Sequence, residues 1–113
     1  MAANLARLAA LAAMIQDREL GKLQQAQLKR ISIENSLLEL RRAKTNITQI
    51  EDFDTARLAG RDQVWTDWAD QKIAALNVGL AKAAAEAETQ KKATRLAFGR
   101  ASVLKNLSER KSD

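Results

Sequence analysis

The side chains that most often carry out enzyme chemistry are scarce in this chain. It contains no His and no Cys, so it offers no imidazole base, no thiol nucleophile and no common set of zinc ligands. Ser, Lys, Asp and Glu are present, but none stands in a spacing typical of a catalytic group, and no glycine-rich phosphate loop occurs. The sequence therefore predicts no enzyme activity, no cofactor, no metal and no small-molecule substrate.

Two groups of residues are instead typical of surfaces that bind proteins. In the first, Trp65 and Trp68 stand three residues apart, with Leu58 and Phe53 a little earlier in the chain. Trp is enriched among the residues that dominate binding energies. Large aromatic side chains also fill the cores of helical proteins. The group therefore has two interpretations, a partner-binding site or a plug where two helices diverge.

The second group lies near the end of the chain, where Phe98 and Gly99 stand between Arg95 and Arg100. A glycine in the middle of a helix allows another chain to approach the backbone closely, although it also costs stability. Gly99 is therefore either part of a contact surface or a glycine that a long helix tolerates. The stretch 91–111 that contains this group is the most basic part of the chain.

The composition indicates that helices position both groups. The chain has 113 residues, no Pro, four Gly and 46% hydrophobic residues, many of which are Ala. Good helix formers dominate, and nothing forces a helix to break. Small side chains fill a compact core poorly but suit the contact line of two closely apposed helices. We therefore expect long paired helices.

A seam of mostly apolar residues runs through the second half of the chain in alternating steps of four and three. Nine of its twelve positions are apolar, and the pattern is sustained over about 60 Å of helix at 1.5 Å per residue. Its middle is rich in alanine, which buries little surface. The twelve positions are Ala69, Ile73, Leu76, Leu80, Ala83, Ala87, Gln90, Thr94, Ala97, Ala101, Leu104 and Ser108.

The first half is also predicted to be helical, but its apolar residues do not follow one line. An opening stripe is formed by Leu5, Leu8, Leu11 and Ile15. One stripe continues the helix through Leu20, Leu23, Leu28, Ile31 and Leu38, and a second, rotated stripe runs through Ile33, Leu37, Leu40, Ala43, Ile47 and Ile50. A stripe that drifts around a helix is typical of a helix that wraps its neighbour or contacts more than one.

The chain is predicted to reverse between Thr45 and Asp62. Thr45–Thr48 is poor in helix formers, and Glu51–Thr55 and Gly60–Asp62 both offer residues that end or begin helices. One arm is expected at about 2–50 and the other at about 62–110. The predicted fold is all-α, a single elongated antiparallel two-helix coiled-coil hairpin over residues 1–113.

Charge and targeting signals narrow the class of protein further. The net charge is +5, of which residues 1–56 carry +1 (eight basic, seven acidic) and residues 57–113 carry +4 (eleven basic, seven acidic). Nucleic acid is not the expected partner, because acidic residues are interleaved and no recognition motif occurs. The apolar run near the N-terminus is interrupted by Arg7, which argues against a signal peptide and a membrane span. The absence of Cys suggests the cytoplasm.

The segment Ala97-Phe98-Gly99-Arg100-Ala101, within residues 93–107 of a chain that doubles back, resembles the FliJ/YscO family. These are small coiled-coil stalk proteins of flagellar and type III secretion export ATPases. The resemblance implies that the joined ends enter a hexameric ATPase ring and that the apex, with Phe53, Leu58, Trp65 and Trp68, faces an export-gate component at the membrane. The implied ring-contacting residues are Leu5, Leu8, Arg95, Phe98, Gly99, Arg100, Leu104 and Lys105.

A different function remains open. Amphipathic hairpins readily associate into four-helix bundles, so the chain is also compatible with a scaffold or adaptor that dimerises. A stalk that fits inside a ring is expected to be a monomer when free, whereas a bundle protein is expected to be a homodimer. Binding of nucleic acid by the basic tail is a third and weaker alternative.

Overall fold

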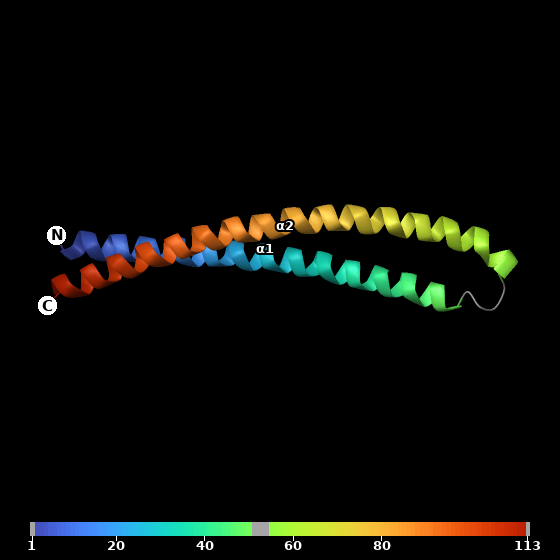
Figure 1. The fold of residues 1–113 in the computed structure, drawn as a ribbon. Coiled ribbons are helices and arrows are strands. Elements are labelled where there is room, and N and C mark those ends of the chain that lie inside the picture. Colours follow the sequence, from blue (N-terminus) through green and yellow to red (C-terminus); the bar gives the residue numbers. More distant parts are fainter. Residues whose placement is uncertain (1, 51–54, 113) are drawn as a thin grey trace. The chain divides into compact units, whose positions relative to one another are not determined.

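The computed structural model describes residues 2–50 and 55–112, and these form two helices. Helix α1 runs from Ala2 to Ile50 (49 residues) and helix α2 from Thr55 to Ser112 (58 residues). At 1.5 Å per residue the helices are about 74 and 87 Å long. No strand occurs within the described ranges. The prediction of an all-α antiparallel helical hairpin is confirmed (Figure 1).

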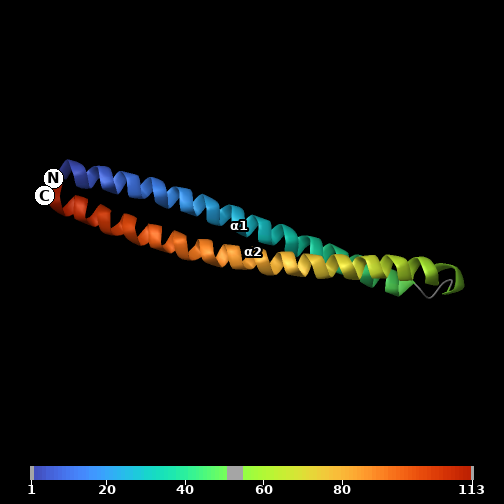
Figure 2. The same ribbon diagram turned by 90° about the horizontal axis from the view of Figure 1, so that it is seen from above.

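The hairpin divides into two units, each made of one stretch from either helix. In unit 1, residues 1–28 pair with residues 84–113, and in unit 2, residues 29–83 form the second compact body. The first turns of α1 and the last turns of α2 lie together at one end of unit 1, as both views show (Figure 2). In unit 2, Ile33 Cδ1 lies 3.9 Å from the position that a Cβ atom on Gly79 would take.

The break between the two helices falls within the window predicted for the chain reversal. Helix α1 continues through Thr45 and ends at Ile50, and the Thr45 hydroxyl donates a hydrogen bond of 2.9 Å to the Arg41 carbonyl oxygen one turn earlier. Helix α2 begins at Thr55 and runs through Gly60, so it starts seven residues before the expected second arm at 62. Residues 51–54 lie outside the described ranges.

The seam predicted for the second half agrees with the burial in the structure. All twelve of its positions, from Ala69 to Ser108, are buried or half-buried. Between these two residues the only other positions that are not fully exposed are Gly79 and Ala84. The heptad pattern alone was therefore sufficient to find the contact face of α2.

Helix α1 agrees with its prediction in part, because one regular seam includes Ile33, Leu37, Leu40 and Ile47 of the rotated stripe but only Leu23 of the stripe from Leu20 to Leu38. Apart from the small residues Gly21 and Ala43, the half-buried and buried positions follow the heptad without interruption, and four of them are polar or charged. Leu20, Leu28, Ile31 and Leu38, which formed most of the first predicted stripe, are exposed. The seam of α1 comprises Leu5, Ala9, Ala12, Gln16, Glu19, Leu23, Ala26, Arg30, Ile33, Leu37, Leu40, Lys44 and Ile47.

Polar partners explain how charged side chains occupy this seam. In unit 2, Lys44 forms an ion pair with Asp70 on the facing helix, and Arg30 Nε lies 3.5 Å from a Glu34 carboxylate oxygen. The Arg30 Nε atom is buried and donates no hydrogen bond. The drift was predicted because only apolar residues were counted, whereas Arg30 and Lys44 occupy seam positions with an opposite charge within reach.

The core consists mainly of small side chains. Among the described residues of unit 1, the buried ones are Ala12, Ala87, Thr94, Ala97 and Ala101. Unit 2 buries Ala69, Ala83 and one large side chain, Leu37. Alanine allows the two helix axes to approach closely, but each turn of such a seam removes little apolar surface from water.

Candidate functional site

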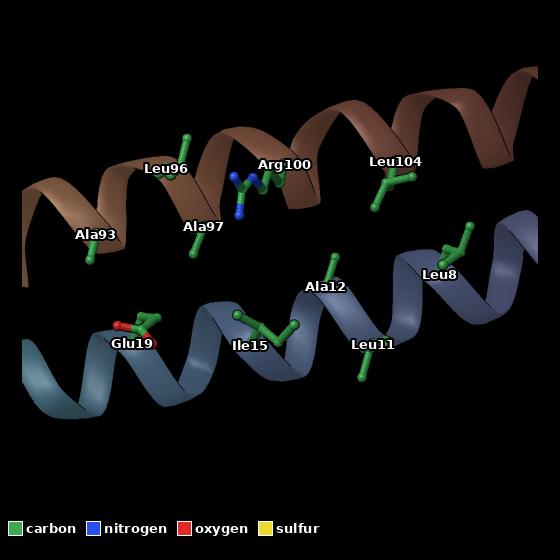
Figure 3. A pocket seen from close by; sticks show the side chains of 10 residues that line it. All are labelled: Leu8, Leu11, Ala12, Ile15, Glu19, Ala93, Leu96, Ala97, Arg100 and Leu104. Carbon is green, nitrogen blue, oxygen red and sulfur yellow. The ribbon is translucent and has the colours of Figure 1, made fainter.

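The most distinct surface feature is an apolar groove along one side of unit 1. Its volume is about 370 Å³, and both helices contribute side chains to it. Figure 3 shows these side chains projecting from the facing turns of α1 and α2, with Leu8 and Leu104 toward one end and Glu19 and Ala93 toward the other. We call this the unit 1 groove; it is lined by Leu8, Leu11, Ala12, Ile15, Glu19, Ala93, Leu96, Ala97, Arg100 and Leu104.

The large apolar side chains of this groove are exposed to an unusual degree. Leu11 is 53% exposed and Leu96 54%, and Val103, in an adjoining hollow on α2, is 57% exposed. In a coiled coil of only two helices, the positions that flank the seam are usually occupied by charged residues. An apolar stripe that includes both the seam and one flank is typical of a helix with more than one helical neighbour.

The groove also carries one unmatched positive charge. Arg100 lines it near its middle and forms no ion pair with any residue that the structure describes. Arg95 lies beside Arg100 in the adjoining hollow. The groove's carboxylate, that of Glu19, already accepts hydrogen bonds from Gln90 and Lys22. The surface is therefore apolar with a basic rim.

The eight residues implied for the ring-contacting end do not share one face of unit 1. Leu8, Arg100 and Leu104 line the groove, and Arg95 and Gly99 adjoin it on the outer surface of α2. Leu5 is half-buried in the seam. A separate hollow contains the last two, Phe98 and Lys105, and is lined by Ala9, Ala13, Gln16, Phe98, Ala101, Ser102 and Lys105.

Three large apolar residues of the groove surface were not among the predicted site residues. Leu11 and Ile15 were assigned to the opening stripe of the first helix, and Leu96 lies in the segment 93–107 that carries the family resemblance but was not named as a contact residue. The signal that could have found them is the heptad itself. Once the seam of α1 is placed at Ala9, Ala12 and Gln16, Leu11 and Ile15 must lie beside it rather than in it.

Gly99 leaves open space on the surface of α2. A Cβ atom built at this position would meet no described atom within 4 Å, and the same is true at Gly21 on α1. Neither glycine is therefore required by packing within the described part of the chain. Gly99 can therefore still be either part of a contact surface or a glycine that the helix tolerates. Gly21 is a matched control for it, because a Cβ atom meets open space at both positions.

The aromatic pair predicted at the apex lies in unit 2. The ring centroids of Trp65 and Trp68 are 6.3 Å apart and the rings are inclined by 46°. Trp65 is half-buried, but Trp68 is exposed. Phe53 and the side chain of Leu58 lie outside the described residues, so the two tryptophans alone represent this predicted site in the structure.

A polar cluster crosses the seam of unit 1 next to the groove. The side-chain amide of Gln90 and the hydroxyl of Thr94 each donate a hydrogen bond of 3.1 Å to the backbone carbonyl of Glu19. Gln90 also donates to the Glu19 carboxylate. This hydrogen bond, helped by nearby Lys22 and Arg18, lowers the pKa of Glu19 below its usual value of 4.5 although partial desolvation opposes the shift. The cluster fixes the register of the two helices in unit 1.

We expect this cluster to make stability depend on pH. Because the folded pKa of Glu19 is lowered, its contribution is complete above the usual value of 4.5 and is lost as the pH falls through the folded pKa. Urea unfolding measured between about pH 6 and pH 3 should show a decrease in stability that is smaller in Glu19→Gln. Gln90→Leu should reduce this pH dependence as well. An unchanged pH profile in both variants would contradict the role of the cluster.

Comparison with known proteins adds no assignment: no family model, no curated protein and no solved structure matches the chain. Within the described ranges, neither helix is long and apolar enough over any stretch to cross a membrane. The same residues contain no group of three or more His, Cys, Asp or Glu side chains that could hold a metal ion.

Proposed function

We propose that this chain is a non-catalytic coiled-coil adaptor that binds another protein through unit 1, acting as a cytoplasmic stalk for a hexameric export ATPase. The resemblance to the FliJ/YscO family suggests the ring as the partner and a flagellar or type III export gate as the second contact. Hydrolysis would belong to the ring. The adaptor would couple the ring to the membrane machinery without entering the membrane itself.

The observation that carries this proposal is the apolar surface left uncovered on unit 1. The seam there is closed by small residues such as Ala97 and Ala101, whereas larger side chains such as Leu11 and Leu96 remain in solvent. Isolated exposed leucines are common, but several that line one groove mark a contact surface. The neighbouring basic side chains Arg95 and Arg100 would steer an acidic partner surface, so binding should weaken as salt is added.

Capture of a purified export ATPase of the flagellar or type III class by the tagged full-length chain tests the proposal. The wild type should retain the ATPase, and the double variant Arg100→Glu with Phe98→Ala should bind at least about tenfold more weakly. Phe98 lies in a different hollow from the groove. A ring that surrounds unit 1 would contact both places, so both substitutions should contribute.

Matched controls exist on unit 2 and on α1. The pair Arg42→Glu with Val78→Ala makes the same kinds of change at exposed positions of unit 2 and should leave capture unchanged. Gly99→Ala should weaken capture if the ring approaches this backbone, whereas Gly21→Ala should not. Failure of the wild type to retain the ATPase would overturn the proposal, and full capture by the Arg100/Phe98 double variant would overturn the end-on mode of binding.

The same exposed surface favours one second candidate, a scaffold protein that dimerises through unit 1. Two hairpins that joined their apolar flanks would form a four-helix bundle. Mass measurement by light scattering over a range of concentrations distinguishes the two functions. The stalk should be a monomer when free, whereas the scaffold should be a stable dimer.

A further inference from the structure

We infer that the unit 1 groove accepts one amphipathic α-helix from a protein partner and that this helix carries acidic residues beside its apolar face. The inference rests on the proposed function only in assigning partner binding to unit 1. It adds the chemistry of the segment of the partner that occupies the groove, and leaves contacts elsewhere on unit 1 to other parts of that partner. The arrangement that results is a three-helix coiled coil made of α1, α2 and the added helix.

The distribution of apolar residues fits a third helix. Both α1 and α2 extend their seam onto the same flank. Leu8 and Leu104 lie toward each other at one end of the groove, whereas Leu11 and Leu96 project from the outer sides of their helices (Figure 3). The lining spans residues 8–19 of α1, which correspond to about three turns, or 17 Å, of helix. Amphipathic helices bind to grooves of this kind through apolar residues spaced three and four apart.

The charge of the groove selects the kind of helix. Arg100 lies among apolar side chains near the middle of the groove and forms no ion pair with a described residue. A helix bound against it would remove water from the guanidinium group, and desolvating an unpaired charge is costly. A Glu or Asp on the added helix would provide a bidentate partner. Arg95 lies in the adjoining hollow and would favour further acidic residues along the same edge.

A second copy of the chain fits this charge pattern poorly. A two-fold axis through the middle of the groove would bring the Arg100 side chains of both copies together. The groove carboxylate that could separate them, Glu19, is already bonded to Gln90 and Lys22. Like charges facing each other in an interface oppose association. We therefore assign the groove to a different and acidic helix.

Fluorescence anisotropy with two synthetic peptides tests the inference. Each is a stapled helix of about 14 residues, or four turns, with leucine along one face; one carries Glu beside that face and the other Lys at the same positions. The full-length chain should bind the Glu peptide at least about tenfold more tightly than the Lys peptide. Arg100→Glu should reverse this preference.

Variants on the two sides of unit 1 locate the binding. Leu11→Asp, at an exposed groove position that should not disturb folding, should abolish binding of the Glu peptide. Phe98→Ala, which alters the other hollow, should leave it unchanged. Equal binding of the two peptides, an unaltered preference in Arg100→Glu, or a stable dimer that Leu11→Asp converts to a monomer would overturn the inference. The peptide experiment contains no ATPase, so it tests the groove alone. Its failure would not affect the proposed binding to an export ATPase, and failure to capture the ATPase would not affect the peptide result.

Discussion

Replacement of Leu37 by alanine is expected to destabilise the protein by about 2–5 kcal/mol. Leu37 is only 3% exposed and is the one large side chain among the buried residues that the structure describes. The substitution removes apolar surface that is almost wholly shielded from water and leaves a space in the seam of unit 2, and both effects lower stability. The loss should appear as a lower midpoint in thermal or urea unfolding followed by circular dichroism.

The adjacent Leu38 provides the matched control. It is 47% exposed, so Leu38→Ala removes the same atoms from the same helix but should change stability by no more than about 0.5 kcal/mol. Sequence reasoning placed Leu37 and Leu38 in two competing stripes of the first helix. Equal losses in both variants would mean that α1 uses both stripes and that the single seam is wrong.

The fold could be predicted from sequence because α2 carries an unbroken heptad seam. From Ala69 to Ser108 every seam residue except Gln90 is small or apolar. The contact face of α2 is therefore recognisable without knowledge of the helix that packs against it. The absence of Pro and the abundance of Ala restricted the chain to long helices. Two long helices of this kind bury their seams most simply by folding back on each other.

The register of α1 could not be predicted in the same way, because its seam includes residues whose suitability depends on the facing helix. Glu19 is acceptable in the seam only because Gln90 and Thr94 donate hydrogen bonds to it. Lys44 is acceptable because Asp70 faces it. These pairs are separated by 71 to 75 and by 26 residues, so no local pattern reveals them.

The candidate site was predicted in part for the same reason. Arg100 and Leu8 were named as contact residues, and both line the unit 1 groove. Leu11 was assigned to the opening stripe of the first helix, and only the correct register of α1 places it outside the seam. Phe98 and Arg100 are two residues apart in sequence, but the helical turn directs them into different hollows. The segment 97–101 therefore indicated that the contact surface lies on unit 1, but it did not show which of its residues line the groove and which line the other hollow.

Replacement of Ala87 by aspartate is expected to destabilise the protein by on the order of 3 kcal/mol, because it places a carboxylate in the seam. Ala87 is 6% exposed and lies in the alanine-rich middle of α2, so an aspartate there would bury its carboxylate if the two helices stayed in place. Ala85→Asp, two residues away at an exposed position, carries the same intrinsic helix cost and should change stability by only about 0.5 kcal/mol.

This comparison separates two physical views of the alanine run. If the run is a closely packed seam, only Ala87→Asp should lower the unfolding midpoint. On heating, this variant should lose its helical circular dichroism at a lower temperature than Ala85→Asp. If the run is instead a stretch where the helices barely touch, water can reach both positions and the two variants should unfold together. Identical midpoints would therefore show that the small residues of α2 contribute no cohesive packing in unit 1.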